Sequence, residues 1–201
     1  CIRDRIEPVV VTFAPAEIQP GPQQSAAFKR VADMMKKDKN LKLTIEQTLG
    51  ASDIDLASRR ANPPREDAGA LAARYRERKA ALEQEVKDEV AKVRVAVASQ
   101  SEAQAAASLA ALRSTSAELA ATDANLELLL ELQRPGADRY SERRTKAAAV
   151  IIGNQRLQSV ESTLRAAGIP GDAVTVKPAK FNPEDAPEGK VTIVINRVAK
   201  E

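Results

Sequence analysis

The chain has 201 residues and a formal net charge of +3, with acidic and basic residues in nearly equal numbers. Aromatic residues make up only 2% of it and Trp is absent, which argues against nucleic-acid binding, since that needs excess positive charge and rings on which bases stack. Without any His, the sequence lacks the commonest metal ligand and every Ser-His or Cys-His mechanism. We therefore expect a protein that is not an enzyme and needs no metal or cofactor.

The start of the sequence leaves two interpretations open. There is no initiator Met, no signal peptide and no run of about eighteen apolar residues, so we expect a mature product or a fragment without a transmembrane segment. The single cysteine, Cys1, excludes an internal disulfide framework. It is either a lipid-modified amino-terminal residue or the boundary of a fragment.

The first third of the chain predicts a strand, a helix and a strand. The β-branched run at 9–13, VVVTF, indicates the first strand. A helix is expected over 23–37, where Lys residues crowd the carboxyl end. Strict alternation of apolar and polar residues over Leu41–Gln47 predicts the second strand, and its polar side suggests that one face of the sheet is exposed. The polar stretch Gly50–Pro64 is expected to be irregular.

The middle of the chain predicts two long helices, Glu66–Ala98 and a second helix that begins at Ser101 and ends before Pro135. Ser101 and Gln104 have the spacing of a capping box. Each helix carries an apolar stripe at helical spacing: Leu71, Tyr75, Leu82, Val86, Val90, Val93 and Val97 in the first, and Leu109, Leu112, Leu119, Leu126 and Leu129 in the second. Stripes of similar length joined by a short turn predict an antiparallel αα-hairpin.

Two roles for this hairpin are open. It is either an arm that binds a partner or oligomerises, or a pair of helices whose apolar stripes bury one another. Its alanine-rich inner positions favour the second role, because they allow close helix approach and leave little apolar surface over.

The last third predicts a helix over Ser141–Ala167, ended by Gly168 in a left-handed conformation. A short strand at 173–177, a Pro-rich loop at 181–189 and an alternating strand at 190–198 follow. Without the hairpin, the order of elements is β-α-β-α-β-β.

Several segments in this order resemble an OmpA-like domain. VVVTFAPAEIQP resembles its opening strand, LKLTIEQ its second strand, LQSVESTLRAAGIPGDAV its second helix and exit, and NPEDAPEGKVTIVINRV its closing loop and strand. With the long helical insertion, the chain is similar to the C-terminal module of AsmA-like envelope proteins that carry a domain of unknown function. The resemblance covers both ends, roughly half of the chain.

The resemblance implies an α+β fold with two helices on one face of an open sheet. The expected strand order is first, third, second, with the closing strand on an edge. The implied domains are 1–56 and 141–201, the two halves of the OmpA-like domain, and 57–140, the helical hairpin insertion.

The resemblance also implies a place and a role. AsmA-like proteins of this kind are anchored in the inner membrane, extend across the periplasm of Gram-negative bacteria, and are implicated in lipid transport and outer-membrane homeostasis. The chain would be a non-catalytic periplasmic tail that interacts with other envelope proteins. The alternative is a wall anchor that binds peptidoglycan.

OmpA-like domains bind the diaminopimelate of peptidoglycan through an Asp after the second strand and an Arg in the second helix. A zwitterion needs a carboxylate for its ammonium group and a guanidinium for its carboxylate. The Arg position matches Arg156, twelve residues before Gly168, whereas Gln47–Gly50 stands where the Asp motif would be. Asp53 and Asp55 lie close by but offset.

The candidate peptidoglycan-binding residues are therefore Arg156, Asp53 and Asp55. The alternative is that Arg156 is a surface residue, or forms a structural pair with Asp53 or Glu161.

Overall fold

The computed structural model describes residues 6–14, 16–181 and 187–198. Cys1 and most of the predicted Pro-rich loop lie outside them. The chain forms two compact units, one made of Cys1–Ala57 with Ile152–Glu201 and the other of Ser58–Ile151. The second unit thus extends beyond 140, where the predicted insertion ended.

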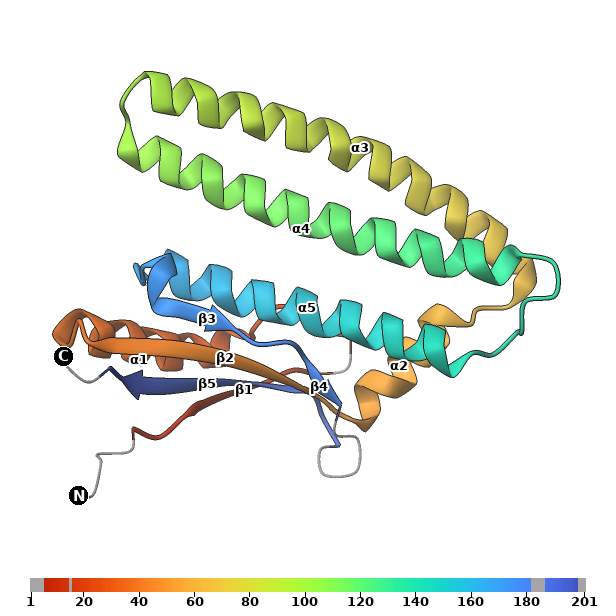
Figure 1. Cartoon of the computed structure of the whole chain (residues 1–201), viewed down its shortest axis with the longest axis horizontal. Helices are drawn as coiled ribbons and strands as arrows, with labels where there is room; N and C mark the ends of the chain where they lie inside the picture. Colours follow the sequence, from red (N-terminus) through yellow and green to blue (C-terminus); the bar gives the residue numbers. More distant parts are fainter. Residues whose placement is uncertain (1–5, 15, 182–186, 199–201) are drawn as a thin grey trace. The chain divides into compact units, whose positions relative to one another are not determined.

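The first unit is built on a mixed five-stranded sheet (Figure 1). Its strands are β1 (Val9–Thr12), β2 (Leu41–Leu49), β3 (Val174–Val176), β4 (Lys180–Phe181) and β5 (Lys190–Arg197). The order is β1-β5-β2-β3, with β4 also paired to β2. β5 is antiparallel to both β1 and β2, while β3 and β4 run parallel to β2.

The predicted strand order was wrong, because the closing strand β5 lies inside the sheet and not on an edge. Its length explains this position: eight residues pair with β2 along one side and four pair with β1 along the other. The third predicted strand is only three residues long, and its Val176 is exposed, as suits an edge.

One core holds the sheet and two helices together. Residues of β2 alternate between buried and half-buried positions, so one face of the sheet is apolar. Helix α1 (Ser25–Lys37) and the second part of α5 (Glu142–Ala166) pack on that face. The core consists of Val9, Val11, Phe13, Phe28, Val31, Ala32, Met35, Leu41, Leu43, Ile45, Leu157, Val160, Leu164, Ile169, Ala173, Val191, Ile193 and Ile195.

Helix α5 ends as the sequence predicted. Gly168 has a φ of 90° and occupies the left-handed region. Its N–H donates to the carbonyl of Arg165, and the N–H of Ile169 donates to the carbonyl of Leu164. These two bonds form a Schellman motif, and Ile169 joins Leu164 in the core. The motif therefore fixes the direction in which the chain leaves the helix toward β3.

The segment predicted to be irregular contains a helix, α2 (Ala51–Ala61). Its buried positions are Asp53, Ala57 and Ala61, spaced by four residues. This buried stripe of one carboxylate and two alanines contains no large apolar side chain, so it predicts a helix only weakly.

The second unit contains the predicted antiparallel hairpin, formed by α3 (Arg65–Ala98) and α4 (Glu102–Gln133) (Figure 1). The turn at the tip is another Schellman motif, with Gln100 in the left-handed region at a φ of 54°. Ser101 is the N-cap residue of α4, but its side chain makes no capping hydrogen bond. The predicted capping box therefore located the start of the helix correctly, but the capping hydrogen bond of the Ser101 side chain does not form.

Packing within the hairpin changes along its length. Near the root, Ala72, Leu126 and Leu129 form a buried cluster. Near the tip, Val97 and Leu109 were predicted to be part of the buried stripes, yet they are exposed. Val95 is exposed as well. The expectation that the hairpin leaves little apolar surface over is therefore wrong for the tip.

Candidate functional site

Two of the candidate ligand residues, Asp53 and Arg156, lie together in the first unit. Arg156 Nη1 donates a hydrogen bond of 2.7 Å to Asp53 Oδ1, and both side chains are fully buried. Asp53 is in the first turn of α2, directly after β2, and Arg156 is in the middle of α5. The sheet and α5 thus bring together residues that are far apart in the sequence.

The guanidinium of Arg156 also binds the loop that follows β1. Its Nε donates to the carbonyl of Glu17 at 2.8 Å, and Nη2 lies 3.5 Å from the carbonyl of Ala14. The guanidinium carbon lies 4.9 Å from the ring centre of Phe13, at a distance typical of a cation–π contact. Arg156 therefore has partners on two sides besides the carboxylate.

The second oxygen of Asp53 is occupied too. Oδ2 accepts the N–H of Gly50 at 3.0 Å, which caps the start of α2. The chain passes so close at Gly189 that a β-carbon there would lie 2.0 Å from Asp53 Oδ2 and 2.3 Å from Arg156 Nη1. Backbone bonds from Phe13 to Gly189 and from Ser52 to Pro187 hold this segment in place. Only glycine fits at position 189 without displacing the pair, and the backbone of this segment covers the two side chains.

Asp53 and Arg156 thus form a buried ion pair whose polar groups bind each other and the surrounding backbone. A zwitterionic ligand would have to separate Asp53 from Arg156 and displace the segment at Gly189. Asp55 is not part of this buried pair, because its side chain is exposed. Glu161, the other predicted partner of Arg156, instead binds Arg165 on the same helix.

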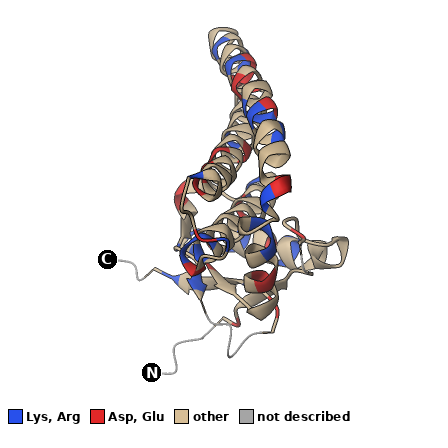
Figure 2. Ribbon diagram, turned by 90° about the vertical axis from the view of Figure 1, so that its right-hand side faces the viewer, with Lys and Arg blue, Asp and Glu red and all other residues tan. Residues whose placement is uncertain are grey.

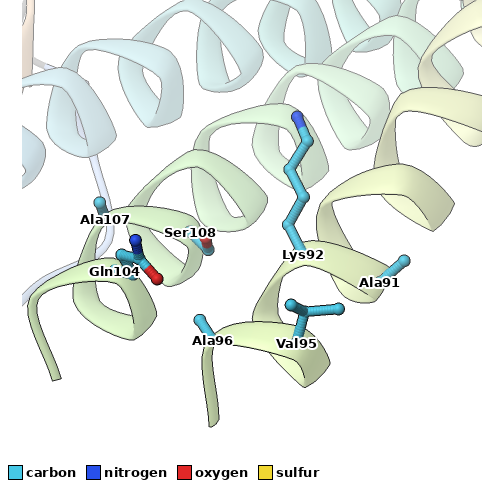
Figure 3. A pocket seen from close by; sticks show the side chains of 7 residues that line it. All are labelled: Ala91, Lys92, Val95, Ala96, Gln104, Ala107 and Ser108. Carbon is cyan, nitrogen blue, oxygen red and sulfur yellow. The ribbon is translucent and has the colours of Figure 1, made fainter. Parts of the chain in front are cut away.

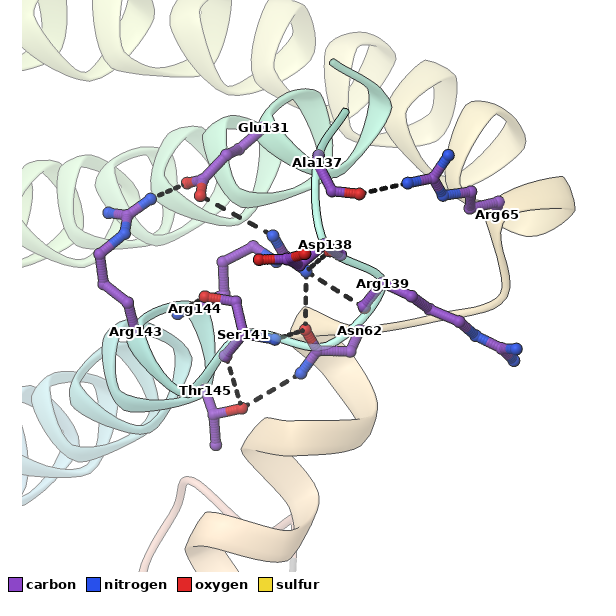
Figure 4. A network of polar contacts seen from close by, with 10 residues as sticks. All are labelled: Asn62, Arg65, Glu131, Ala137, Asp138, Arg139, Ser141, Arg143, Arg144 and Thr145. Carbon is purple, nitrogen blue, oxygen red and sulfur yellow. Dashed lines mark hydrogen bonds and ion pairs between the residues drawn. The ribbon is translucent and has the colours of Figure 1, made fainter. Parts of the chain in front are cut away.

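A second buried arginine, Arg144, organises the root of the second unit (Figure 4). Its Nη2 donates to Asn62 Oδ1 at 3.1 Å and to the carbonyls of Asp138 at 2.6 Å and Arg139 at 3.1 Å. Its Nε is buried without a hydrogen-bond partner. The residue ties the chain between α4 and α5 to the end of α2.

Asn62 and Glu131 complete this network. Asn62 Nδ2 donates to the carbonyl of Ser58 and to Thr145 Oγ1 at 3.0 and 3.1 Å. Glu131 accepts a hydrogen bond from Arg143, and its carboxylate lies 3.8 Å from Arg144 Nη1. The bond from Arg143 holds the pKa of Glu131 below its ordinary value.

The sequence carries one signal of this network. Arg144 precedes Ala148 and Ile152 at helical spacing, so it lies on the buried stripe of α5. A charged residue on such a stripe indicates a buried polar contact.

The hairpin tip carries an apolar groove between its two helices (Figure 3). It has a volume of about 440 Å³. The lining residues are Ala91, Lys92, Val95 and Ala96 of α3 and Gln104, Ala107 and Ser108 of α4. The groove stays open because the alanine side chains on both helices are too short to reach across the interface.

Charges of both signs are scattered along the hairpin (Figure 2). Several of them form ion pairs, among them Arg78 with Glu118 at 2.7 Å and Lys92 with Glu89 at 2.7 Å. A surface of this kind has no large field of one sign and is not suited to a polyanion.

Among the described residues, no cluster of three or more His, Cys, Asp or Glu side chains is arranged to hold a metal ion. No helix in that part of the chain is both long and apolar enough to cross a membrane. Comparison with known protein families, curated proteins and solved structures gives no match.

Proposed function

We propose that this chain is a non-catalytic interaction module of the periplasm, in which the hairpin tip contacts another envelope protein. The observation that carries the proposal is the apolar groove at the tip, which is lined by Val95, itself 68% exposed, and by alanines of both helices. Isolated apolar side chains on a surface are ordinary, but an exposed valine that lines an apolar groove is typical of a contact with another molecule.

The place of this module comes from the resemblance to AsmA-like envelope proteins. On this proposal the chain is a C-terminal tail in the cell envelope of a Gram-negative bacterium, and its parent protein is anchored in the membrane. Lipid transport and outer-membrane homeostasis are roles of the parent, which this tail serves by holding a partner in place.

A photo-crosslinking amino acid at Val95 tests the proposal in the envelope of a Gram-negative host. The matched control carries the same amino acid at Lys87, which is also exposed on α3. We expect a discrete adduct with an envelope protein from position 95 and none from position 87. Equal labelling at both positions, or none at either, would argue against a docking surface at the tip.

Peptidoglycan binding is the second candidate function, and the meeting of Asp53 and Arg156 favours it. The two groups provide the charges that a zwitterion needs, and they are already together. Binding would then require the pair to open and the two groups to rotate toward the ligand, with Asp55 as the alternative carboxylate.

Co-sedimentation with peptidoglycan sacculi separates the two candidates. Arg156→Ala alone is ambiguous, because it leaves a buried carboxylate without its partner and destabilises the fold. The informative variant replaces both members, Asp53→Leu with Arg156→Met, and Asp55→Asn is tested beside it. Binding by the parent that is lost in the double variant supports a wall anchor, and no binding by the parent excludes one.

A further inference from the structure

The face of α4 that points away from α3 has an unusual composition near the tip. Glu102, Ala106, Leu109, Ala110 and Arg113 follow one another at helical spacing and lie on one face. All five are exposed, and Leu109 is exposed by 38%. We call these five residues the outer face of α4.

The outer face is distinct from the surface that binds α3. Ala105, Ser108 and Leu112 are half-buried and lie on the side of α4 turned toward its hairpin partner. They are about one third of a turn away from the outer face. The hairpin therefore satisfies one side of α4 and leaves the outer face without a partner inside this unit.

Charges are nearly absent from this part of α4. Between Ala103 and Ala117, Arg113 is the only charged residue in the sequence. A typical soluble surface has about 25–35% charged residues. Glu102 and Arg113 close the two ends of the apolar part, and among the described residues neither side chain forms an ion pair. Both charges are available to another molecule.

We propose that the outer face of α4 binds the same face of a second copy of this chain, with the two helices antiparallel. If the two-fold axis passes between Ala107 and Ser108, Leu109 of each copy lies against Ala106 of the other. In the same alignment, Arg113 of each copy lies opposite Glu102 of the other. One register thus matches a large apolar residue with a small one and a positive charge with a negative one.

The geometry of helix packing supports this register. Alanine at 106 and 110 allows the two axes to approach to about 8 Å, the lower end of the usual range. Because a two-fold contact is isologous, each favourable pair occurs twice. Residues between Glu102 and Arg113 make no like-charge contact across the axis, since none of them is charged.

The dimer should be weak and depend on concentration. About three helical turns from each copy bury less than the roughly 1,600 Å² of a standard interface. The proposal does not depend on the partner of the tip, and it leaves the groove on the other side of α4 free.

Sedimentation velocity of the full chain over a range of concentrations tests the proposal. We expect a monomer–dimer equilibrium in the parent. Glu102→Arg and Arg113→Glu should each raise the dissociation constant about tenfold, because each change turns two ion pairs into two repulsions. The swapped variant, with both changes, should restore the parent's constant. The control Lys87→Glu reverses an exposed charge on α3 and should leave it unchanged.

Four outcomes would overturn the proposal. A parent that stays monomeric up to about 1 mM would exclude a dimer of useful strength. A dimer that tolerates both single reversals would use another surface. A swapped variant that dimerises as weakly as the single variants would show that Glu102 and Arg113 do not face each other. A monomeric parent that binds a helix of another protein through this face would assign the face to that protein.

Discussion

Asp53→Leu is the sharpest test of the buried ion pair. The two side chains are fully buried and 2.7 Å apart. At an effective dielectric constant of 20, this separation corresponds to a gross attraction of about 6 kcal/mol. The cost of desolvating both groups offsets much of it, so the pair itself adds little net stability. Removing only the carboxylate leaves the Arg156 charge buried and unpaired, which costs about 3–5 kcal/mol.

The measurement is urea denaturation followed by circular dichroism, with hydrogen exchange of β2 and β5 amides reporting on the first unit separately. Asp53→Leu should lower the free energy of unfolding by about 3–5 kcal/mol. The double variant with Arg156→Met should lose less than this single variant, since it leaves no uncompensated charge. Asp55→Asn, an exposed carboxylate on the same helix, should stay within about 0.5 kcal/mol.

A loss below about 1 kcal/mol in Asp53→Leu would refute the reasoning, because it would mean that water reaches Arg156. A double variant whose loss equals the sum of both single losses would refute it as well, since independent contributions exclude a coupled pair.

Three further predictions concern the turns and the second unit. Gly189→Ala places a β-carbon 2.0 Å from a buried carboxylate oxygen and should lower the free energy of unfolding by about 1–3 kcal/mol in a denaturation experiment. The control Gly69→Ala, in open space on α3, should raise the free energy of unfolding by up to about 1 kcal/mol. Gln100→Gly should stabilise the hairpin by about 1 kcal/mol, because glycine adopts the left-handed conformation without strain; a loss of stability would contradict this. Glu131→Gln should destabilise the protein at neutral pH, where the carboxylate binds Arg143. Since the folded-state pKa of Glu131 lies below the ordinary 4.5, this difference should shrink as the pH of the denaturation experiment falls below that value, and a constant difference would argue against the pair.

The sequence predicted most elements but not how the sheet is ordered. Alternation in β2 and β5 is a local property, because side chains point to opposite faces at every second residue. Strand order depends on which backbone groups pair across the fold, and alternation carries no information about it. The length of β5, eight residues, is the feature of this strand that favours a central position, because a long strand can pair along both sides.

The candidate site likewise combines features that the sequence predicted with features that only the structure shows. The resemblance pointed to Arg156 in the predicted helix 141–167, with Asp53 and Asp55 as nearby carboxylates. It did not decide between Asp53 and Asp55, which are two residues apart. Helix α2 was needed for that decision, since it buries the first and exposes the second.

The sequence by itself determined the long helices, the hairpin turn and the glycine stop after α5. Helical periodicity and turn chemistry act over a few residues, so they can be read from the chain. Only the tertiary structure decided the strand order, the closed pair under Gly189, the buried Arg144 network and the exposed apolar tip. Each of these depends on contacts between residues that are distant in sequence, and their burial is set by what packs beside them.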